Sequence, residues 1–334
     1  MSPDRTAGPM RLVFVLSLPR SGSTFLARML VTHPAVTSAS HAEPHLFVSA
    51  FAPLSDLAAR AEWGAGITTR SALDYLAAAP GGAAAYRATL AGAAADTCLA
   101  TATDPGADWF IEKTTRNSLI AADLVQALPE ARFVVMWRNP LDVMASVYRT
   151  WCNDNWTWTA NSVELFTGLD GLVALQTADH PNVATLRYED LVADPQAALA
   201  RLSDFLDIDP GHWTKHEGDL SGVRFAGPHD PRARDADNQR AHARSVAKWR
   251  GSVTTARRRR MARQYLDWIG ADRLAAMGYD AEALRAELDA VSTPLIPSLA
   301  EETRMRALAL RRWASVTAWH ARTETRDFGR HALR

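Results

Sequence analysis

The sequence predicts a P-loop-like three-layer α/β/α fold with a central parallel sheet, followed by a C-terminal helical extension. A continuous apolar run at 11–17 is typical of a strand buried on both faces, and apolar residues at helical spacing follow at 23–31. Three further extended segments, at 109–111, 132–137 and 183–188, are separated by stretches long enough for helices. Strands that alternate with helices indicate βαβ units, whose strands are parallel.

The chain of 334 residues divides into a predicted main domain at 10–283 and a helical extension at 284–334. Between 299 and 323 the extension carries apolar residues on one helical face, which we expect to dock on the main domain or on a second copy of the chain, with contact to a membrane surface as the alternative. The C-terminal helix is therefore a candidate surface for a homo-oligomer. The basic run Arg257–Arg260 points all round a helix axis and is expected to be solvated.

The composition excludes several classes of partner. There are 37 basic and 37 acidic residues, so the net charge favours neither nucleic acid nor an anionic membrane. The two cysteines, Cys98 and Cys152, are too few for a disulfide framework and have no metal-ligand spacing, which favours a cytoplasmic location without a bound metal. The apolar run at 12–16 is too short for a signal peptide or an integral membrane segment.

The segment between the first strand and the first helix, Ser17–Thr24, has the residue types of an oxyanion-binding loop. Backbone N–H groups and the positive end of the helix dipole converge there. Gly22 allows close approach of a ligand, and Arg20 supplies a permanent positive charge. Three side chains add hydroxyl donors: Ser21, Ser23 and Thr24. A Walker A loop would have Gly at position 17 and Lys at position 23, where this chain has serines.

A second anion site is expected where the strand 132–137 ends, because Arg138 begins a turn into a helix that carries Ser146. Their spacing lets the guanidinium and the hydroxyl reach the same phosphate. A Walker B strand would deliver a magnesium-binding Asp at this place, whereas an Arg attracts an anion. The two loops together predict a nucleotide with two separate phosphates. A P-loop-type small-molecule kinase remains the alternative enzyme class.

Four blocks of the sequence resemble, in the same order, the family of sulfotransferases that use 3′-phosphoadenosine 5′-phosphosulfate (PAPS). The segment 18–25 is similar to the family's 5′-phosphosulfate loop, and 138–146 is similar to its 3′-phosphate motif. The segment 186–191 resembles the one that places a Tyr near the adenine, and 245–251 resembles the C-terminal lid over the nucleotide. The resemblance implies these donor-binding residues: Arg20, Ser21, Gly22, Ser23, Thr24, Phe25, Arg138, Ser146, Tyr188, Ser245 and Lys248. By the same analogy, Phe25 stacks on the adenine.

The segment 42–47 resembles the glutamate motif of carbohydrate-directed and tyrosylprotein sulfotransferases, where a Glu after the first helix is the base. This likeness suggests a bacterial enzyme of that branch rather than one like the cytosolic enzymes with a histidine base. We expect Glu43 to take the proton from the acceptor. His41 and His45 would point the same way in an extended segment, so a histidine is the alternative base or a residue that orients the acceptor.

Lys113 follows the strand 109–111 and is expected at the same sheet edge as the two phosphate loops. A Lys near the bridging oxygen would stabilise the charge that appears on the departing nucleotide phosphate, and Arg20 would assist it. The predicted catalytic set is Glu43, Lys113, Arg20 and His45.

These features predict a PAPS-dependent sulfotransferase that leaves 3′,5′-diphosphoadenosine (PAP) and requires no metal. The acceptor is predicted only as a hydroxyl or amine of a small molecule, a glycan or a lipid. Candidates for lining its cleft are Trp151, Trp156 and Trp158. Outside the enzyme class, the alternative is a catalytically silent nucleotide-binding module that kept the donor site.

Overall fold

The computed structural model describes residues 9–39, 43–51, 65–158, 162–213, 245–295, 297–307 and 310. The chain forms two compact units. Unit 1 comprises Met1–Trp249 and Ala271–Tyr279, and unit 2 comprises Arg250–Gly270 and Asp280–Arg334. The expected boundary between residues 283 and 284 stays a prediction about domains.

Unit 1 is built on a five-stranded sheet in the order β2-β3-β1-β4-β5, in which every neighbouring pair is parallel. The strands are β1 (Arg11–Ser17), β2 (Val36–Thr37), β3 (Trp109–Glu112), β4 (Arg132–Trp137) and β5 (Val183–Arg187). The chain passes from β3 to β4 across β1, so the strand order reverses at β1 and a crevice is expected beyond the carboxyl ends there. The predicted α/β fold with a central parallel sheet is confirmed.

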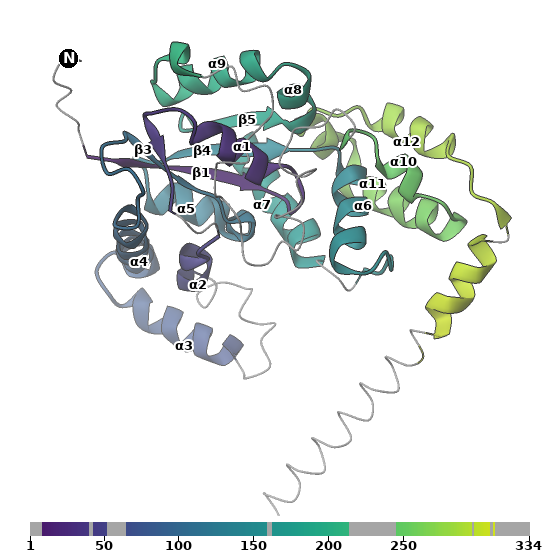
Figure 1. The fold of residues 1–334 in the computed structure, drawn as a ribbon. Coiled ribbons are helices and arrows are strands. Elements are labelled where there is room, and N and C mark those ends of the chain that lie inside the picture. Colours follow the sequence, from purple (N-terminus) through teal and green to yellow (C-terminus); the bar gives the residue numbers. More distant parts are fainter. Residues whose placement is uncertain are drawn as a thin grey trace, which may run out of the picture. The chain divides into compact units, whose positions relative to one another are not determined.

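Helices lie on both faces of this sheet, which gives the three predicted layers (Figure 1). The helices α8 and α9 lie over one face, and α4, α5 and α7 lie over the other. The α-helices up to residue 206 are α1 (Ser23–Leu30), α2 (Leu46–Phe51), α3 (Ala65–Ala77), α4 (Gly82–Leu99), α5 (Ala121–Ala127), α6 (Pro140–Trp151), α7 (Leu169–Thr177), α8 (Tyr188–Ala193) and α9 (Pro195–Leu206). Shorter turns are the 3-10 helices η3 (Thr115–Ile120) and η5 (Pro210–His212) and the π-helix η4 (Val163–Gly168).

The central strand β1 is buried on both faces because its alternate side chains enter two different layers. Val13 and Val15 belong to the apolar cluster that α1, α8 and α9 share with the sheet. On the other face, Phe14 stacks on Phe133 at 5.2 Å between ring centroids and meets Phe47 of α2 edge-on at 5.0 Å. Each such side chain contributes about 1.5–3 kcal/mol by leaving water. β1 is therefore a rigid support for the loop that follows it.

The start of α6 is determined by local sequence. The side chain of Asn139 accepts a hydrogen bond from the backbone N–H of Leu141 at 3.0 Å, and Pro140 occupies the first helical position. β4 ends at Trp137, so only Arg138 and the capping Asn139 separate strand from helix. Arg138 is thereby held at the carboxyl edge of the sheet.

Unit 2 contains α12 (Ala281–Asp289), a helical segment at 297–307 and most of α11 (Ala256–Ala276). The short α10 (Trp249–Ser252) begins on the last residue of the first part of unit 1. Gly270 interrupts α11 with φ 77° and ψ 165°, and the chain returns to unit 1 directly after it. Of the helix expected at 299–323, the structure describes residues up to 307 and residue 310, and the remainder lies outside the described residues.

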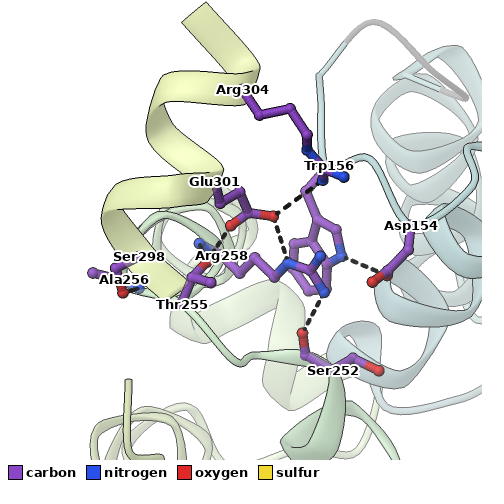
Figure 2. A network of polar contacts seen from close by, with 9 residues as sticks. All are labelled: Asp154, Trp156, Ser252, Thr255, Ala256, Arg258, Ser298, Glu301 and Arg304. Carbon is purple, nitrogen blue, oxygen red and sulfur yellow. Dashed lines mark hydrogen bonds and ion pairs between the residues drawn. The ribbon is translucent and has the colours of Figure 1, made fainter. Parts of the chain in front are cut away.

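The expectation that Arg257–Arg260 is a solvated run is wrong for one of its members. Arg258 is buried and its Nε donates to Oε1 of Glu301 at 2.8 Å (Figure 2). A helix directs only part of such a run towards solvent, and here the inward position has an acidic partner on the 297–307 helix.

A membrane-crossing segment is not found in the part of the chain that the structure describes, because none of its helices is both long and apolar enough.

Candidate active site

The loop between β1 and α1 has the geometry that its glycine predicts. Gly22 adopts φ 92°, and a Cβ built on it would lie 2.4 Å from Cδ2 of Tyr188. A larger residue would therefore be strained and would collide with that ring. Arg20 also has a left-handed backbone, with φ 66°. The loop is thus a tight turn closed against the first residue of α8.

Two hydroxyls of this loop are buried without a partner among the described residues. They are Oγ of Ser17, at the end of β1, and Oγ of Ser21, just before α1. Burying a hydroxyl without a hydrogen bond is unfavourable, so such groups suit a site that receives an oxyanion. Ser23 is buried and Thr24 is half-buried in the first turn of α1, whereas Phe25 is half-buried and packs against the apolar cluster.

The two predicted phosphate loops meet at Arg20. Its Nε donates to Oγ of Ser146 at 3.2 Å, and its carbonyl oxygen accepts from Nη1 of Arg138 at 2.8 Å. The Arg138 guanidinium lies 4.7 Å from the centre of the Tyr188 ring, and its Nη2 donates to the carbonyl of Ser245 at 2.6 Å. Residues from four separate segments of the sequence therefore lie together around Arg20 and Arg138. Lys248 lies in the same turn as Ser245 and is exposed.

Glu43 and Lys113 form an ion pair that the sequence did not predict. Nζ of Lys113 lies 2.5 Å from Oε1 of Glu43, and the side chains are 3% and 17% exposed. Lys113 follows β3 directly, and β3 pairs with β1, so the ion pair belongs to the same edge of the sheet as the Arg20 loop. Opposite charges this close in a buried place hold each other firmly.

The sequence analysis assumed that the segment around Glu43 is extended, and the structure shows that it is not. Glu43 has φ 61° and His45 has φ 56°, both in the left-handed region. The rule that residues two apart point the same way therefore does not apply to this pair. His45 is half-buried, and its carbonyl accepts from the N–H of Ser49 at 3.0 Å. His41 lies outside the described residues.

Glu112, which the sequence analysis did not select, is buried directly beneath the Lys113 turn. Its carboxylate accepts from the N–H of Thr114 at 3.2 Å, from Oγ1 of Thr114 at 2.5 Å and from Nδ2 of Asn117 at 2.6 Å. Burial raises the pKa of Glu112 to about 7, although the Thr114 bonds and the charge of Lys113 oppose the shift. The sequence feature that could have identified Glu112 is a carboxylate at the end of a strand of apolar residues, because a carboxylate buried there needs hydrogen-bond partners.

The stability of the protein should depend on the ionisation of Glu112. An exposed Glu ionises near pH 4.5, so between pH 4.5 and 7 the folded chain binds more protons at this residue than the unfolded chain. The Glu112 contribution to the free energy of unfolding therefore falls as the pH rises through this window. We expect wild type to lose about 1 kcal/mol per pH unit relative to Glu112→Gln in urea unfolding at pH 5, 6 and 7. Parallel profiles would contradict this, and Glu130→Gln, at an exposed position, is the control.

The three tryptophans after α6 occupy different environments. Trp156 is buried and packs on Tyr148 at 5.1 Å, and Trp158 packs on Phe166 at 5.6 Å. Trp151 is 39% exposed, and the Arg20 guanidinium lies 5.8 Å from its ring centre. Trp151 therefore combines exposure with a position beside the Arg20 loop.

A metal-binding cluster is not found in the portion of the chain described by the structure, where no three His, Cys, Asp or Glu side chains are placed to share an ion.

Comparison with known proteins gives three kinds of match. Residues 12–214 match the model of a family described as the sulfotransferase family. The nodulation protein NoeE of Sinorhizobium fredii (strain NBRC 101917 / NGR234) is 28% identical in an alignment 307 residues long, which covers 83% of this chain and 68% of that protein. The sulfotransferase domain from the curacin biosynthetic pathway has a TM-score of 0.45 and 16% identity, with 78% of this chain and 98% of that chain covered. Mouse sulfotransferase SULT7A1 complexed with PAP has a TM-score of 0.45 and 16% identity, with 82% and 90% covered.

Proposed function

Because this chain belongs to the sulfotransferase family, we propose that its sulfuryl donor is PAPS and that the Arg20 and Arg138 loops hold the donor's two phosphates. The observation that carries the proposal is the direct contact between these two loops: Arg138 donates to the carbonyl of Arg20, and Arg20 donates to Ser146. Two cationic side chains and a hydroxyl converge beside a helix start, as recognition of two phosphates requires.

In this proposal the donor is gripped at three places. The loop Ser21–Thr24 binds the 5′-phosphosulfate, and the buried hydroxyl of Ser21 fits that role because it has no other partner among the described residues. Arg138 and Ser146 bind the 3′-phosphate. Ser245 and Lys248 bind the donor beside them. The aromatic rings of Tyr188 and Phe25 pack beside the adenine. Residues 10–283 form the sulfotransferase domain.

The proposed chemistry is an in-line transfer of the sulfuryl group. Glu43 takes a proton from the acceptor hydroxyl or amine as the acceptor atom bonds to sulfur, and the bond between sulfur and the 5′-phosphate oxygen breaks. Lys113 and Arg20 stabilise the negative charge that grows on that oxygen. The ion pair between Glu43 and Lys113 supports this division of roles, because it holds the base and the cation together at the reacting edge. His45 remains the alternative base.

We propose that the acceptor is a small molecule, a glycan or a lipid. Trp151 supports an acceptor with an apolar face, since its exposed ring lies beside Arg20.

The scheme needs no metal, because protein cations neutralise the leaving phosphate. A cytoplasmic location and a homo-oligomer through the C-terminal helix stay predictions.

Nucleotide binding tests the donor assignment. Calorimetric titration should show that PAP without metal binds at least about tenfold more tightly than ATP with magnesium, because Arg138 and Ser146 have a second phosphate to bind only in PAP. Tighter binding of ATP with magnesium would instead favour a P-loop-type kinase.

Turnover tests the enzyme assignment. Incubation with PAPS and an extract of the source organism should add the mass of one sulfuryl group to an acceptor. If PAP binds tightly but no acceptor in any panel gains this mass, the chain is a silent nucleotide-binding module and the proposed chemistry is wrong.

A further inference from the structure

Asp142 is a buried carboxylate for which the proposed chemistry has no use. It lies in the first turn of α6 and is 1% exposed. Its side chain does not cap its own helix, because Asn139 already does so. Both oxygens are instead directed to a distant segment: Oδ2 accepts from the N–H of Ala247 at 2.8 Å, and Oδ1 accepts from the N–H of Trp249 at 2.9 Å.

The segment that Asp142 binds, Ser245–Trp249, also contacts Arg138. The carbonyl of Ser245 accepts from Nη2 of Arg138 at 2.6 Å, and the carbonyl of Arg20 accepts from Nη1 at 2.8 Å. These two carbonyls lie on different loops and together orient the plane of the guanidinium. The position of the Ser245 carbonyl therefore determines where the free part of that guanidinium points.

The turn is not a conformation that its own sequence favours. Ala247 has φ 58°, in the left-handed region that a residue with a Cβ rarely adopts. Such a backbone persists only when its surroundings hold it. The two N–H bonds to Asp142 supply that hold, together with the complete burial of the Trp249 side chain.

We propose that Asp142 is a positioning residue for donor binding: it holds the Ser245–Trp249 turn and thereby orients Arg138 for the 3′-phosphate. The proposal rests on the proposed function for the role of Arg138. The chain of contacts is direct at each step, from Asp142 to two backbone amides, from their turn to the Ser245 carbonyl, and from that carbonyl to Arg138. Burial raises the pKa of Asp142, and the positive charge of Arg138, four residues earlier, opposes that shift.

The test compares two nucleotides that differ only in the 3′-phosphate. Asp142→Asn keeps the size of the side chain, but its amide nitrogen cannot accept the second N–H. We expect the Kd of PAP to rise about tenfold or more, because a hydrogen bond to a charged group is lost, and the Kd of adenosine 5′-monophosphate to change less than about twofold. A merely structural role would weaken both nucleotides equally.

Hydrogen exchange supplies a readout that does not depend on nucleotide binding. In Asp142→Asn without ligand, the amides of Ala247 and Trp249 should exchange at least about tenfold faster than in wild type. Asp142→Glu keeps the charge and both acceptor oxygens, so it should retain more affinity for PAP than the Asn variant. It is also the variant to compare if the Asn form does not fold.

Asp123→Asn is the matched control, because Asp123 lies in the first turn of α5 and pairs with Arg87 at 3.5 Å. Both nucleotides should bind it as they bind wild type. Wild-type PAP affinity and unchanged amide exchange in Asp142→Asn would overturn the proposal while the donor assignment stands. A wild-type chain that binds both nucleotides equally well would overturn the 3′-phosphate site, and the role of Asp142 with it.

Discussion

Replacing Lys113 by Met should lower the turnover of PAPS by a factor of about 10² to 10³. The expected loss is large because Lys113 is the buried cation at the sheet edge, next to the proposed base. Without it, Arg20 is the remaining cation proposed to stabilise the charge on the departing phosphate oxygen. Release of PAP in an extract that contains the acceptor measures the effect.

The ion pair allows the role of Lys113 to be tested together with that of Glu43. Glu43→Gln should lower turnover to a similar extent, because the proton of the acceptor then has no carboxylate to receive it. Since Lys113 and Glu43 lie 2.5 Å apart and are proposed to act in one step, the double variant should lose much less than the product of the two single losses. Lys113→Arg, which keeps the charge, should retain more activity than Lys113→Met.

Two results would contradict this role of Lys113. One is a Lys113→Met enzyme with turnover within about threefold of wild type. The other is a loss that is fully explained by lower thermal stability or by failure to bind PAP. Arg285→Met is the control for removal of a cation, because Arg285 pairs with Asp267 in unit 2, and its turnover should stay unchanged.

Replacing Arg258 by Met should lower the free energy of unfolding by about 3–5 kcal/mol. Arg258 and Glu301 are both buried and hydrogen-bonded, and Nη1 of Arg258 also donates to the carbonyl of Ser252 at 2.9 Å. Thr255 donates to the other oxygen of Glu301, so the network in Figure 2 satisfies both charges. Removing the cation leaves the Glu301 carboxylate buried, with the more exposed Arg304 at 3.9 Å.

The chain offers a matched control for this variant. Arg260 and Glu302 form an ion pair at 3.2 Å between the same two helices, but Arg260 is 61% exposed. Arg260→Met should therefore change the free energy of unfolding by less than about 1 kcal/mol. Replacing both Arg258 and Glu301 by Met should recover most of the loss, because no buried charge then remains. Equal effects of Arg258→Met and Arg260→Met in urea unfolding would show that burial of the pair does not matter.

The strands could be predicted because their signal is local. The runs at 11–17 and 132–137 coincide with β1 and β4, since a strand covered on both faces needs consecutive apolar residues. The strand expected at 183–188 is one residue shorter because Tyr188 already begins α8, and helix starts are set by backbone geometry that composition does not reveal.

The contacts between segments far apart in the sequence could not be predicted in the same way. Three sets of contacts join residues more than forty positions apart. They are the ion pair of Glu43 with Lys113, the bonds of Asp142 to Ala247 and Trp249, and the bond of Arg258 to Glu301. No periodicity or spacing encodes such pairs, because they depend on which strands become neighbours and on how loops fold back. The left-handed backbones of Glu43 and His45 likewise invalidated an argument that assumed an extended segment.

By itself, the sequence predicted the class of the protein, a parallel α/β sulfotransferase, from a Gly-containing turn after its first strand and an arginine after a later one. Those features are short, contiguous and chemically restrictive, so residue order alone reveals them. The tertiary structure decided which groups meet. It brought Arg138 to the carbonyl of Arg20, and it joined Lys113 to Glu43, because parallel strands align their carboxyl ends whatever their separation in the chain.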